Sequence, residues 1–106
     1  MSIFLDFPSL GKNSHAALAP WCGRNALDAA VSTYMSVSAM RQQMKPTTRV
    51  HGIIVGGGVT PCIIPSRTMM RFYMRGICDE DAADARDKVL NCAKAAAEAT
   101  GQFKDF

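Results

Sequence analysis

The stretch that decides the fold is TMMRFYMR, residues 68–75. Every second position from Thr68 to Met74 is apolar or β-branched, and the positions between them carry two arginines, a tyrosine and a methionine. This alternation predicts a β-strand with one buried face. A sheet that is covered on one side only is typical of antiparallel sheets. The stretch therefore predicts such a sheet, with helices packed against one of its faces.

Two helical segments flank this strand. Asn25 is a favourable N-cap for the first helix, which we expect Pro46 to end. Its buried stripe runs beside a second apolar line, made of Leu27, Val31, Tyr34 and Met35. One stripe is enough to bury a surface helix against a sheet, so the second line indicates a further surface to cover. The second helix is predicted over residues 79–100, with an acidic first turn that suits the helix dipole and Gly101 as its C-cap.

Three further strands complete the pattern. Residues 2–8 are apolar and aromatic, and we expect Pro8 to end their pairing or to sit at a bulge, because proline cannot donate to a ladder. Residues 47–55 are rich in β-branched side chains, and residues 102–106 can add a short fourth strand. The order β-α-β-β-α-β predicts an α+β fold, the ferredoxin-like split βαβ sandwich, with a four-stranded antiparallel sheet and two helices on one face. Right-handed crossovers put the first and third strands in the centre and residues 47–55 on an edge.

The composition limits the classes of function. A chain of 106 residues can build one modest core, so we expect residues 1–106 to form a single domain. No apolar run is long enough to span a membrane, and the start of the chain lacks the features of a signal peptide. The net charge of +3 is scattered along the chain, whereas nucleic-acid binders concentrate it. We therefore expect a cytoplasmic protein with no membrane and no nucleic-acid partner.

One of the two histidines stands in a distinctive setting. His15 lies in GKNSHAA, residues 11–17, followed by Pro20 and by GRNA at residues 23–26. Small neighbours let a partner surface approach closely, and imidazole can polarise or protonate a substrate near neutral pH. From the spacing alone, His15 could equally be a loop histidine whose ring hydrogen-bonds the backbone.

The chain resembles the dimerisation (lid) domain of the zinc-dependent amidohydrolases of metallopeptidase family twenty. The resemblance rests on the GKxSHA segment with the proline, glycine and NA that follow it, on VHGII and GGVxPxIIP within residues 50–65, on MRFYMR at residues 70–75 and on the alanine-rich residues 93–101. WCGRNALDAAV at residues 21–31 and RQQMKP at residues 41–46 are similar to the branch of aminobenzoyl-glutamate hydrolases and dipeptidases.

The resemblance implies roles for three residues. In the family, the histidine that matches His15 reaches across the dimer and polarises the substrate carbonyl in the neighbouring subunit. The arginine that matches Arg75 can clamp a substrate carboxylate, a task that suits the planar guanidinium, although a strand arginine is more commonly a solvated charge. Cys62 stands where the family commonly has an asparagine that contacts the substrate. A thiol is a poorer hydrogen-bonding group, so that contact is weakened or the chain is divergent.

The metal chemistry of the family is expected outside these residues. A zinc site needs at least three protein ligands, and neither His15 nor His51 stands in H-x-D or H-E-x-x-H. The four cysteines form no C-x-x-C pair, so we expect reduced thiols in small buried or half-buried sites; they are Cys22, Cys62, Cys78 and Cys92. We therefore predict no metal site in this chain, an inert isolated chain, and zinc in a separate catalytic domain.

Three functions remain open. The first is the dimerisation and substrate-capping domain of a zinc amidohydrolase that acts on N-acyl amino acids or dipeptides. The second is a free-standing ferredoxin-like module that binds a small ligand or a protein. The third is RNA binding, which needs exposed aromatic side chains on central strands, and only Tyr73 meets that need. For the first function we predict a homodimer through residues 47–55 and the outer side of the first helix, because this edge carries little charge.

Overall fold

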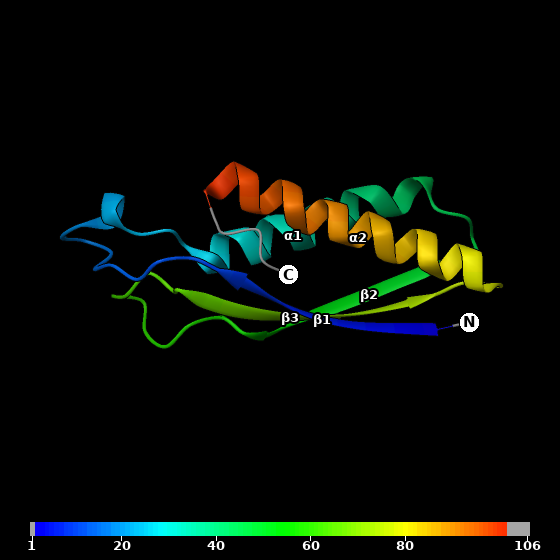
Figure 1. The fold of residues 1–106 in the computed structure, drawn as a ribbon, viewed down its shortest axis with the longest axis horizontal. Helices are drawn as coiled ribbons and strands as arrows, with labels where there is room; N and C mark the ends of the chain where they lie inside the picture. The colour runs from blue at the N-terminus through cyan, green and yellow to red at the C-terminus, as the bar shows by residue number, and fades with distance from the viewer. Residues whose placement is uncertain (1, 102–106) are drawn as a thin grey trace.

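A computed structural model describes residues 2–101 as two layers, a three-stranded antiparallel sheet and two α-helices that cover one of its faces (Figure 1). The elements are β1 (Ser2–Leu10), α1 (Ala26–Met40), β2 (Arg49–Gly56), β3 (Arg67–Arg75) and α2 (Asp79–Thr100), with 3₁₀ turns at Pro20–Cys22 and Arg41–Gln43. The α+β class and the antiparallel sheet agree with the sequence prediction. The predicted fourth strand, residues 102–106, lies outside the described residues.

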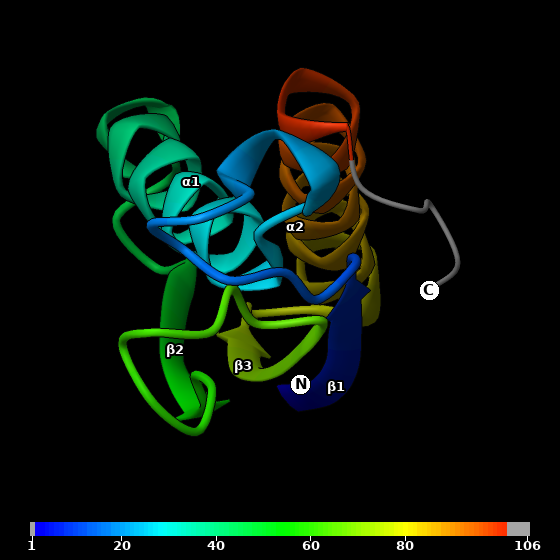
Figure 2. The ribbon, with the colours of Figure 1, turned by 90° about the vertical axis from the view of Figure 1, so that its left-hand side faces the viewer.

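Strand β3 lies between β1 and β2, and the end-on view of Figure 2 shows both helices above this sheet. Every second residue of β3 is buried, as predicted; these residues are Thr68, Met70, Phe72 and Met74. β1 pairs with it over its whole length, from Ser2 opposite Arg75 to Leu10 opposite Arg67. Among the described residues β2 lies on an edge, as predicted, and β3 lies in the centre. The predicted central position of β1 would need a further strand beside it, and the residues predicted for that strand, 102–106, lie outside the described residues.

Pro8 neither ends the pairing of β1 nor sits at a bulge, and this expectation was wrong. Pro8 lies opposite Met69, and the ladder continues through Ser9 and Leu10. Within the described residues β1 has a neighbouring strand on one side only. Such a strand tolerates proline at positions where no N–H is needed by the ladder.

Helix α1 begins as predicted and ends earlier than predicted. The Asn25 side chain caps it by accepting the backbone N–H groups of Leu27 at 3.0 Å and Asp28 at 3.2 Å. The α-helix ends at Met40, and a 3₁₀ turn follows before Pro46. A tighter last turn is common at helix ends, and the residue before a proline is pushed out of the helical region. The Arg41 Nε also donates to the Val50 carbonyl at 3.0 Å, which ties this turn to β2.

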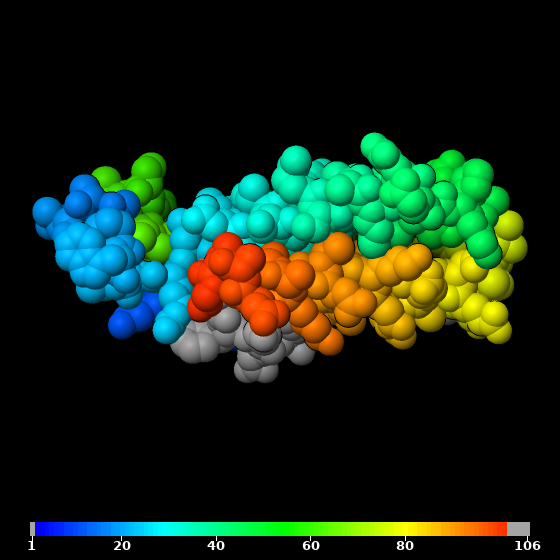
Figure 3. Space-filling view, turned by 90° about the horizontal axis from the view of Figure 1, so that it is seen from above, coloured from blue at the N-terminus to red at the C-terminus, as the bar shows by residue number. Residues whose placement is uncertain are grey.

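The core lies between the helices and the covered face of the sheet. Its largest fully buried side chains come from β3, led by Phe72, whose ring stacks on Phe7 at 5.9 Å between ring centroids. The buried face of α2 is made almost entirely of alanine, at positions 82, 85, 93, 96 and 97, with Val89. Small side chains let the helix approach closely, and Figure 3 shows α1 and α2 side by side along the molecule.

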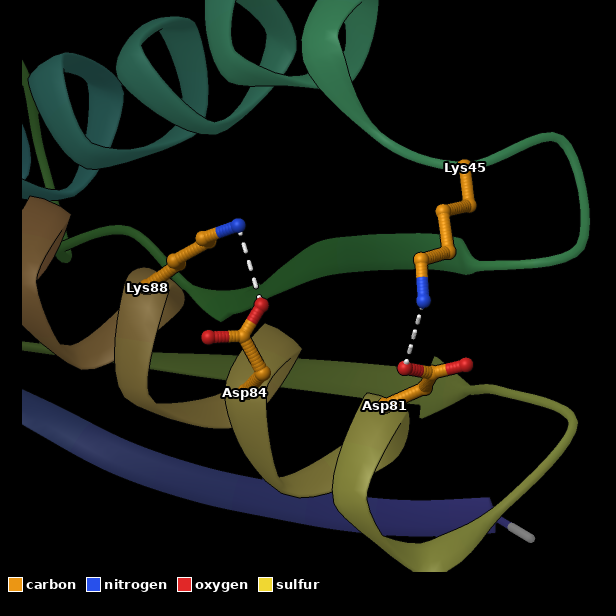
Figure 4. A network of polar contacts seen from close by, with 4 residues as sticks. All are labelled: Lys45, Asp81, Asp84 and Lys88. Atoms are coloured by element: carbon orange, nitrogen blue, oxygen red, sulfur yellow. Dashed lines mark hydrogen bonds and ion pairs between the residues drawn. The ribbon is translucent and has the colours of Figure 1, made fainter.

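The acidic start of α2 is engaged in ion pairs. Asp81 accepts from Lys45 at 3.2 Å, which links α2 to the segment before β2, and Asp84 accepts from Lys88 at 2.9 Å one turn along the helix (Figure 4). Within residues 2–101, no group of three His, Cys, Asp or Glu side chains is placed to hold a metal ion. None of the helices described is long and apolar enough to cross a membrane.

The cysteines are more exposed than the sequence suggested. Cys92 is half-buried, as expected, and burial raises the pKa of its thiol. The other three are exposed, which contradicts the expectation of small buried sites. Each of them lies outside the helices and strands, in a 3₁₀ turn, a loop or a helix cap, where little of the core is within reach.

Gly52 in β2 is required by the packing of the central strand. It lies opposite Phe72, and a Cβ added at Gly52 would overlap the Phe72 ring. We predict that Gly52→Ala lowers the free energy of unfolding by about 1–3 kcal/mol, as overpacking of a core does. Urea unfolding measures this change. Gly56→Ala is the matched control, because an added Cβ there meets nothing within 4 Å; equal losses in the two variants would contradict the packing explanation.

Candidate functional site

The residues singled out from the sequence lie at two opposite ends of the molecule. His15 and Cys62 belong to the loops beyond the end of β1 and the start of β3, whereas Arg75 ends β3 (Figure 1). The nine residues of β3 rise about 3.3 Å each, so Arg75 lies about 26 Å along the strand from that end. The structure therefore brings His15 and Cys62 together and places Arg75 elsewhere in the same chain.

The segment that carries His15 is held between two others, and we call this end of the molecule the tip (residues 11–25 and 57–66). On one side His15 forms a β-bridge with Ile63. Two backbone hydrogen bonds flank this bridge, from Ala16 N to Cys62 O at 2.9 Å and from Ile64 N to Ser14 O at 2.8 Å. On the other side Lys12 and Arg24 exchange two backbone hydrogen bonds of 2.9 Å. These bonds give the tip an ordered backbone outside the main sheet.

Gly23 allows the close approach of these segments. A Cβ at Gly23 would overlap the Ser14 hydroxyl and lie 3.1 Å from the Lys12 carbonyl oxygen and 3.2 Å from Ile64 Cδ1. In the part of the chain that is described, the Ser14 hydroxyl is buried and has no hydrogen-bond partner. A glycine is thus needed at position 23, because any side chain there would overlap Ser14, the residue before His15.

The His15 ring is oriented by the backbone that follows it. Its Nδ1 accepts hydrogen bonds from the backbone N–H groups of Ala17 at 3.1 Å and Leu18 at 3.2 Å. An accepting Nδ1 carries no hydrogen, so the ring hydrogen of neutral His15 is on Nε2. The side chain is exposed. His15 is therefore a loop histidine bonded to the backbone, and the same bonds leave Nε2–H as an outward-facing donor.

Cys62 contributes its backbone to the tip, while its thiol is free and exposed. The carbonyl that receives Ala16 N–H holds this residue next to the His15 segment. The position at which the family commonly carries an asparagine thus lies beside His15. The sequence gives no local signal for this proximity, because the two residues are far apart in the chain and belong to different loops.

Arg75 has a neighbour that the sequence did not reveal. It lies directly opposite Arg49 of β2 on one side and Ser2 of β1 on the other. Both arginines are exposed and border a hollow of about 540 Å³ at this end of the sheet. The position of Arg49 opposite Arg75 depends on the register between β2 and β3, which shifts between Ile54 and Gly56. This register cannot be predicted from the sequence.

The open face of the sheet also carries a row of rings. Phe4 lies 4.8 Å from Tyr73 and His51 lies 6.5 Å from it, between ring centroids. Tyr73 of β3 thus has a ring neighbour on each adjacent strand. In the adjacent row, Arg71 donates to both Asp6 carboxylate oxygens, at 2.8 and 3.0 Å. These hydrogen bonds lower the pKa of Asp6 and raise the pKa of Arg71.

An exposed apolar surface runs along the free side of β2 and onto α1. Its members are Val31, Tyr34 and Met35 of α1 with Ile53 and Val55 of β2, and we call it the β2–α1 surface. Met35 is 63% exposed and Ile53 is 58% exposed. A hollow of about 300 Å³ between the two elements is lined by the α1 members, Gly52, Ile53 and Ile54. The second apolar line predicted for the first helix is thus largely uncovered in the single chain.

A model of the peptidase dimerisation domain family matches residues 3–101. The chain belongs to this family. The dimerisation domain is 54% identical over 96 residues to an Xaa-Arg dipeptidase of Mus musculus, which covers 91% of this chain and 22% of that protein. It is 33% identical over 72 residues to a p-aminobenzoyl-glutamate hydrolase homolog of Haemophilus influenzae, which covers 68% of this chain and 17% of that protein.

A solved structure supports the fold of the dimerisation domain. The aminobenzoyl-glutamate utilization protein of Klebsiella pneumoniae superposes with a TM-score of 0.84 at 20% identity, over 96% of this chain and 26% of that chain. The chain therefore spans about a quarter or less of the proteins that it resembles. The resemblance to the dimerisation domain of these amidohydrolases, drawn from the sequence motifs, is confirmed.

We predict that Gly23→Ala disturbs the tip of the dimerisation domain. The added Cβ meets Ser14 and the backbone of Lys12, so the free energy of unfolding falls by about 1–3 kcal/mol and the His15 ring resonances shift. Both changes can be measured, by urea unfolding and by NMR.

Ser14→Ala is the matched control for this variant. Removal of a buried hydroxyl without a partner is neutral or stabilising, and the double variant recovers part of the loss because the strongest overlap is gone. A double variant as unstable as Gly23→Ala would show that Ser14 is not the obstacle.

Proposed function

We propose that this chain is the dimerisation and substrate-capping domain of a zinc-dependent amidohydrolase, and that it forms a homodimer through β2 and α1. The observation that carries the proposal is the β2–α1 surface, which lies beside an edge of β2 that pairs with no other strand among the described residues. An edge with unpaired backbone groups is a template for another strand, and soluble proteins usually guard it with charge or proline. From Val50 to Val55 this edge carries no Asp, Glu, Lys or Arg side chain.

Two-fold symmetry would give this dimer a defined arrangement. Antiparallel pairing of two β2 strands joins the two sheets, with the same residues of each protomer meeting at the axis. β2 runs from the end that holds Arg75 towards the tip. The tip of one protomer would therefore lie beside the Arg75 end of its partner. The separation of His15 and Arg75 within one chain is then compatible with a single site built from two chains.

His15 would act in this composite site on the substrate of the neighbouring subunit. The orientation of its ring supports the proposal, since Nδ1 is held by Ala17 and Leu18 and Nε2–H faces outward. A fixed donor aimed at the oxygen of a carbonyl stabilises the negative charge that develops there during attack on an amide. Cys62 lies beside His15 and would contact the same substrate weakly, because a thiol hydrogen-bonds poorly.

The metal of the proposed reaction would belong to the rest of the enzyme. We further propose that zinc is held by a separate catalytic domain and that the isolated chain is inert, as the zinc-ligand motifs missing from the sequence suggest. The names of the relatives, a dipeptidase and an aminobenzoyl-glutamate hydrolase, support an N-acyl amino acid or dipeptide as substrate. Free exposed thiols suit a reducing compartment, and we place the protein in the cytoplasm.

A first prediction concerns the dimer. Ile53→Lys puts a charge in the middle of the β2–α1 surface, where Ile53 is 58% exposed. We expect the dimerisation constant to weaken by at least about tenfold, since a desolvated charge costs more than the 1.4 kcal/mol that this factor requires. Analytical ultracentrifugation at high micromolar concentration measures it.

The control for Ile53→Lys is Phe4→Lys on β1, which lies on the other side of β3 from β2. Phe4 is 73% exposed, and its replacement should leave the dimer unchanged. A wild-type chain that is monomeric throughout this range would contradict the proposed homodimer, as would equal effects of the two substitutions. Dimerisation through another surface would favour the free-standing module as the alternative.

A second prediction concerns His15 in the full-length enzyme. His15→Ala should lower kcat by roughly 10²–10³-fold, the loss typical of one oxyanion donor, while the unfolding temperature changes little because the side chain is exposed. Steady-state kinetics and thermal unfolding measure the two effects separately. If His15 acts in the neighbouring subunit, hybrids of His15→Ala subunits with subunits inactivated at the metal site regain activity. Unchanged kcat in His15→Ala would leave this residue with a structural role only.

A further inference from the structure

Two arginines lie directly opposite each other at the end of the sheet, and neither has an acidic partner among residues 2–101. Arg49 of β2 faces Arg75 of β3 in the register. Directly opposite side chains of an antiparallel pair have Cβ atoms about 4.5–5.5 Å apart, and like charges at these positions destabilise the sheet. Among the ion pairs formed by the described residues, none includes either arginine. This repulsion needs an explanation.

Two other charged side chains of this region are held in ion pairs. Arg71, four residues before Arg75 on β3, is held by both oxygens of Asp6. Asp81 at the start of α2 forms an ion pair with Lys45 (Figure 4). Asp79 and Glu80, also in the first turn of α2, form no ion pair with either arginine, so among the described residues no ion pair compensates the charge of Arg49 or Arg75.

The guanidinium of Arg49 is fixed by the backbone. Its Nη1 donates to the carbonyl oxygens of Pro46 and Thr48. Its Nε and Nη2 make no hydrogen bond to the residues described, and neither does the Arg75 side chain. An arginine whose fork is already oriented loses less freedom when it binds a carboxylate.

The space beside this pair accepts a small molecule. The hollow of about 540 Å³ is lined by Pro46, Thr47, Arg49, Arg75, Gly76 and Ile77. Its volume lies in the usual range for small-molecule sites. The lining contains two positive charges and no acidic side chain, so the site selects anions.

We propose that Arg49 is a second carboxylate-binding residue, which acts together with Arg75 to hold a carboxylate of the substrate in this hollow. Two planar forks can hold both oxygens of one carboxylate, and the bound anion relieves the repulsion between the arginines. The proposal rests on the proposed function for the identity of the ligand. In the two-fold dimer the tip of the partner lies at this hollow, so the clamp would fix the carboxylate end of a substrate whose carbonyl meets the partner's His15.

The test uses the 106-residue chain and glutarate as the probe. Side-chain Nε–H signals of arginine are followed by NMR during the titration. We expect the Arg49 and Arg75 signals to shift together and saturably. Arg49→Gln and Arg75→Gln should each weaken binding by at least about tenfold, since a hydrogen bond to a charged group contributes enough for that factor. Arg49→Lys keeps the charge and loses the fork, so it should weaken binding as well.

The control is Arg71→Gln. This substitution removes a positive charge from the same strand, but one that Asp6 already neutralises, so the dissociation constant for glutarate should change by no more than about twofold. Inorganic phosphate is titrated in parallel, since the same pair could hold free phosphate. Saturable binding of phosphate without binding of glutarate would overturn the assignment. So would an Arg49→Gln or an Arg49→Lys variant that binds glutarate as tightly as the wild type.

The outcome is separable from the proposed function. Ile53→Lys, which addresses the dimer, leaves both arginines in place, so the monomeric variant should still bind glutarate. Glutarate binding in a chain that never dimerises would contradict the dimer and support the clamp. A dimer without glutarate binding would contradict the clamp alone.

Discussion

The pairing of β3 with β1 on one side and β2 on the other sets the positions of Tyr73, Arg75 and Arg49 in this domain. Because side chains alternate along a strand, the register that buries Phe72 and Met74 also puts Tyr73 and Arg75 on the open face. A slip of one residue would exchange the two faces completely. The core of the domain and its outward-facing chemistry are therefore fixed by the same backbone hydrogen bonds.

Local features were predictable where one residue decides them. The alternation of β3, the cap at Asn25 and the left-handed Gly101 at the end of α2 all follow from short-range physics, and the structure contains them. The end of α1 was predicted too late in the chain, because a 3₁₀ turn at Arg41–Gln43 replaces the last helical turn before Pro46. The continued pairing past Pro8 could not be read either, since it depends on which side of β1 has a neighbour.

The functional site was predictable only in its parts. His15 was identified from its motif, but the acceptor role of Nδ1, which assigns the hydrogen to Nε2, required the loop that follows it. Arg49 had no signal in the sequence, because its place opposite Arg75 depends on long-range register. The two ends of the domain then acquire different tasks in our proposal, a polarising donor at the tip and an anion clamp at the opposite end. Two-fold pairing through β2 would bring these tasks together.

The central claim, that the tip of one protomer lies beside the Arg75 end of its partner, can be tested by intermolecular paramagnetic relaxation. A spin label is attached to Cys62 after Cys22, Cys78 and Cys92 are replaced by serine, and the labelled protomers are mixed with unlabelled ¹⁵N protomers. Our account predicts broadening of ¹⁵N signals around Arg49 and Arg75. Broadening confined to residues 11–17 and 60–65, or none at concentrations where the chain is dimeric, would contradict it.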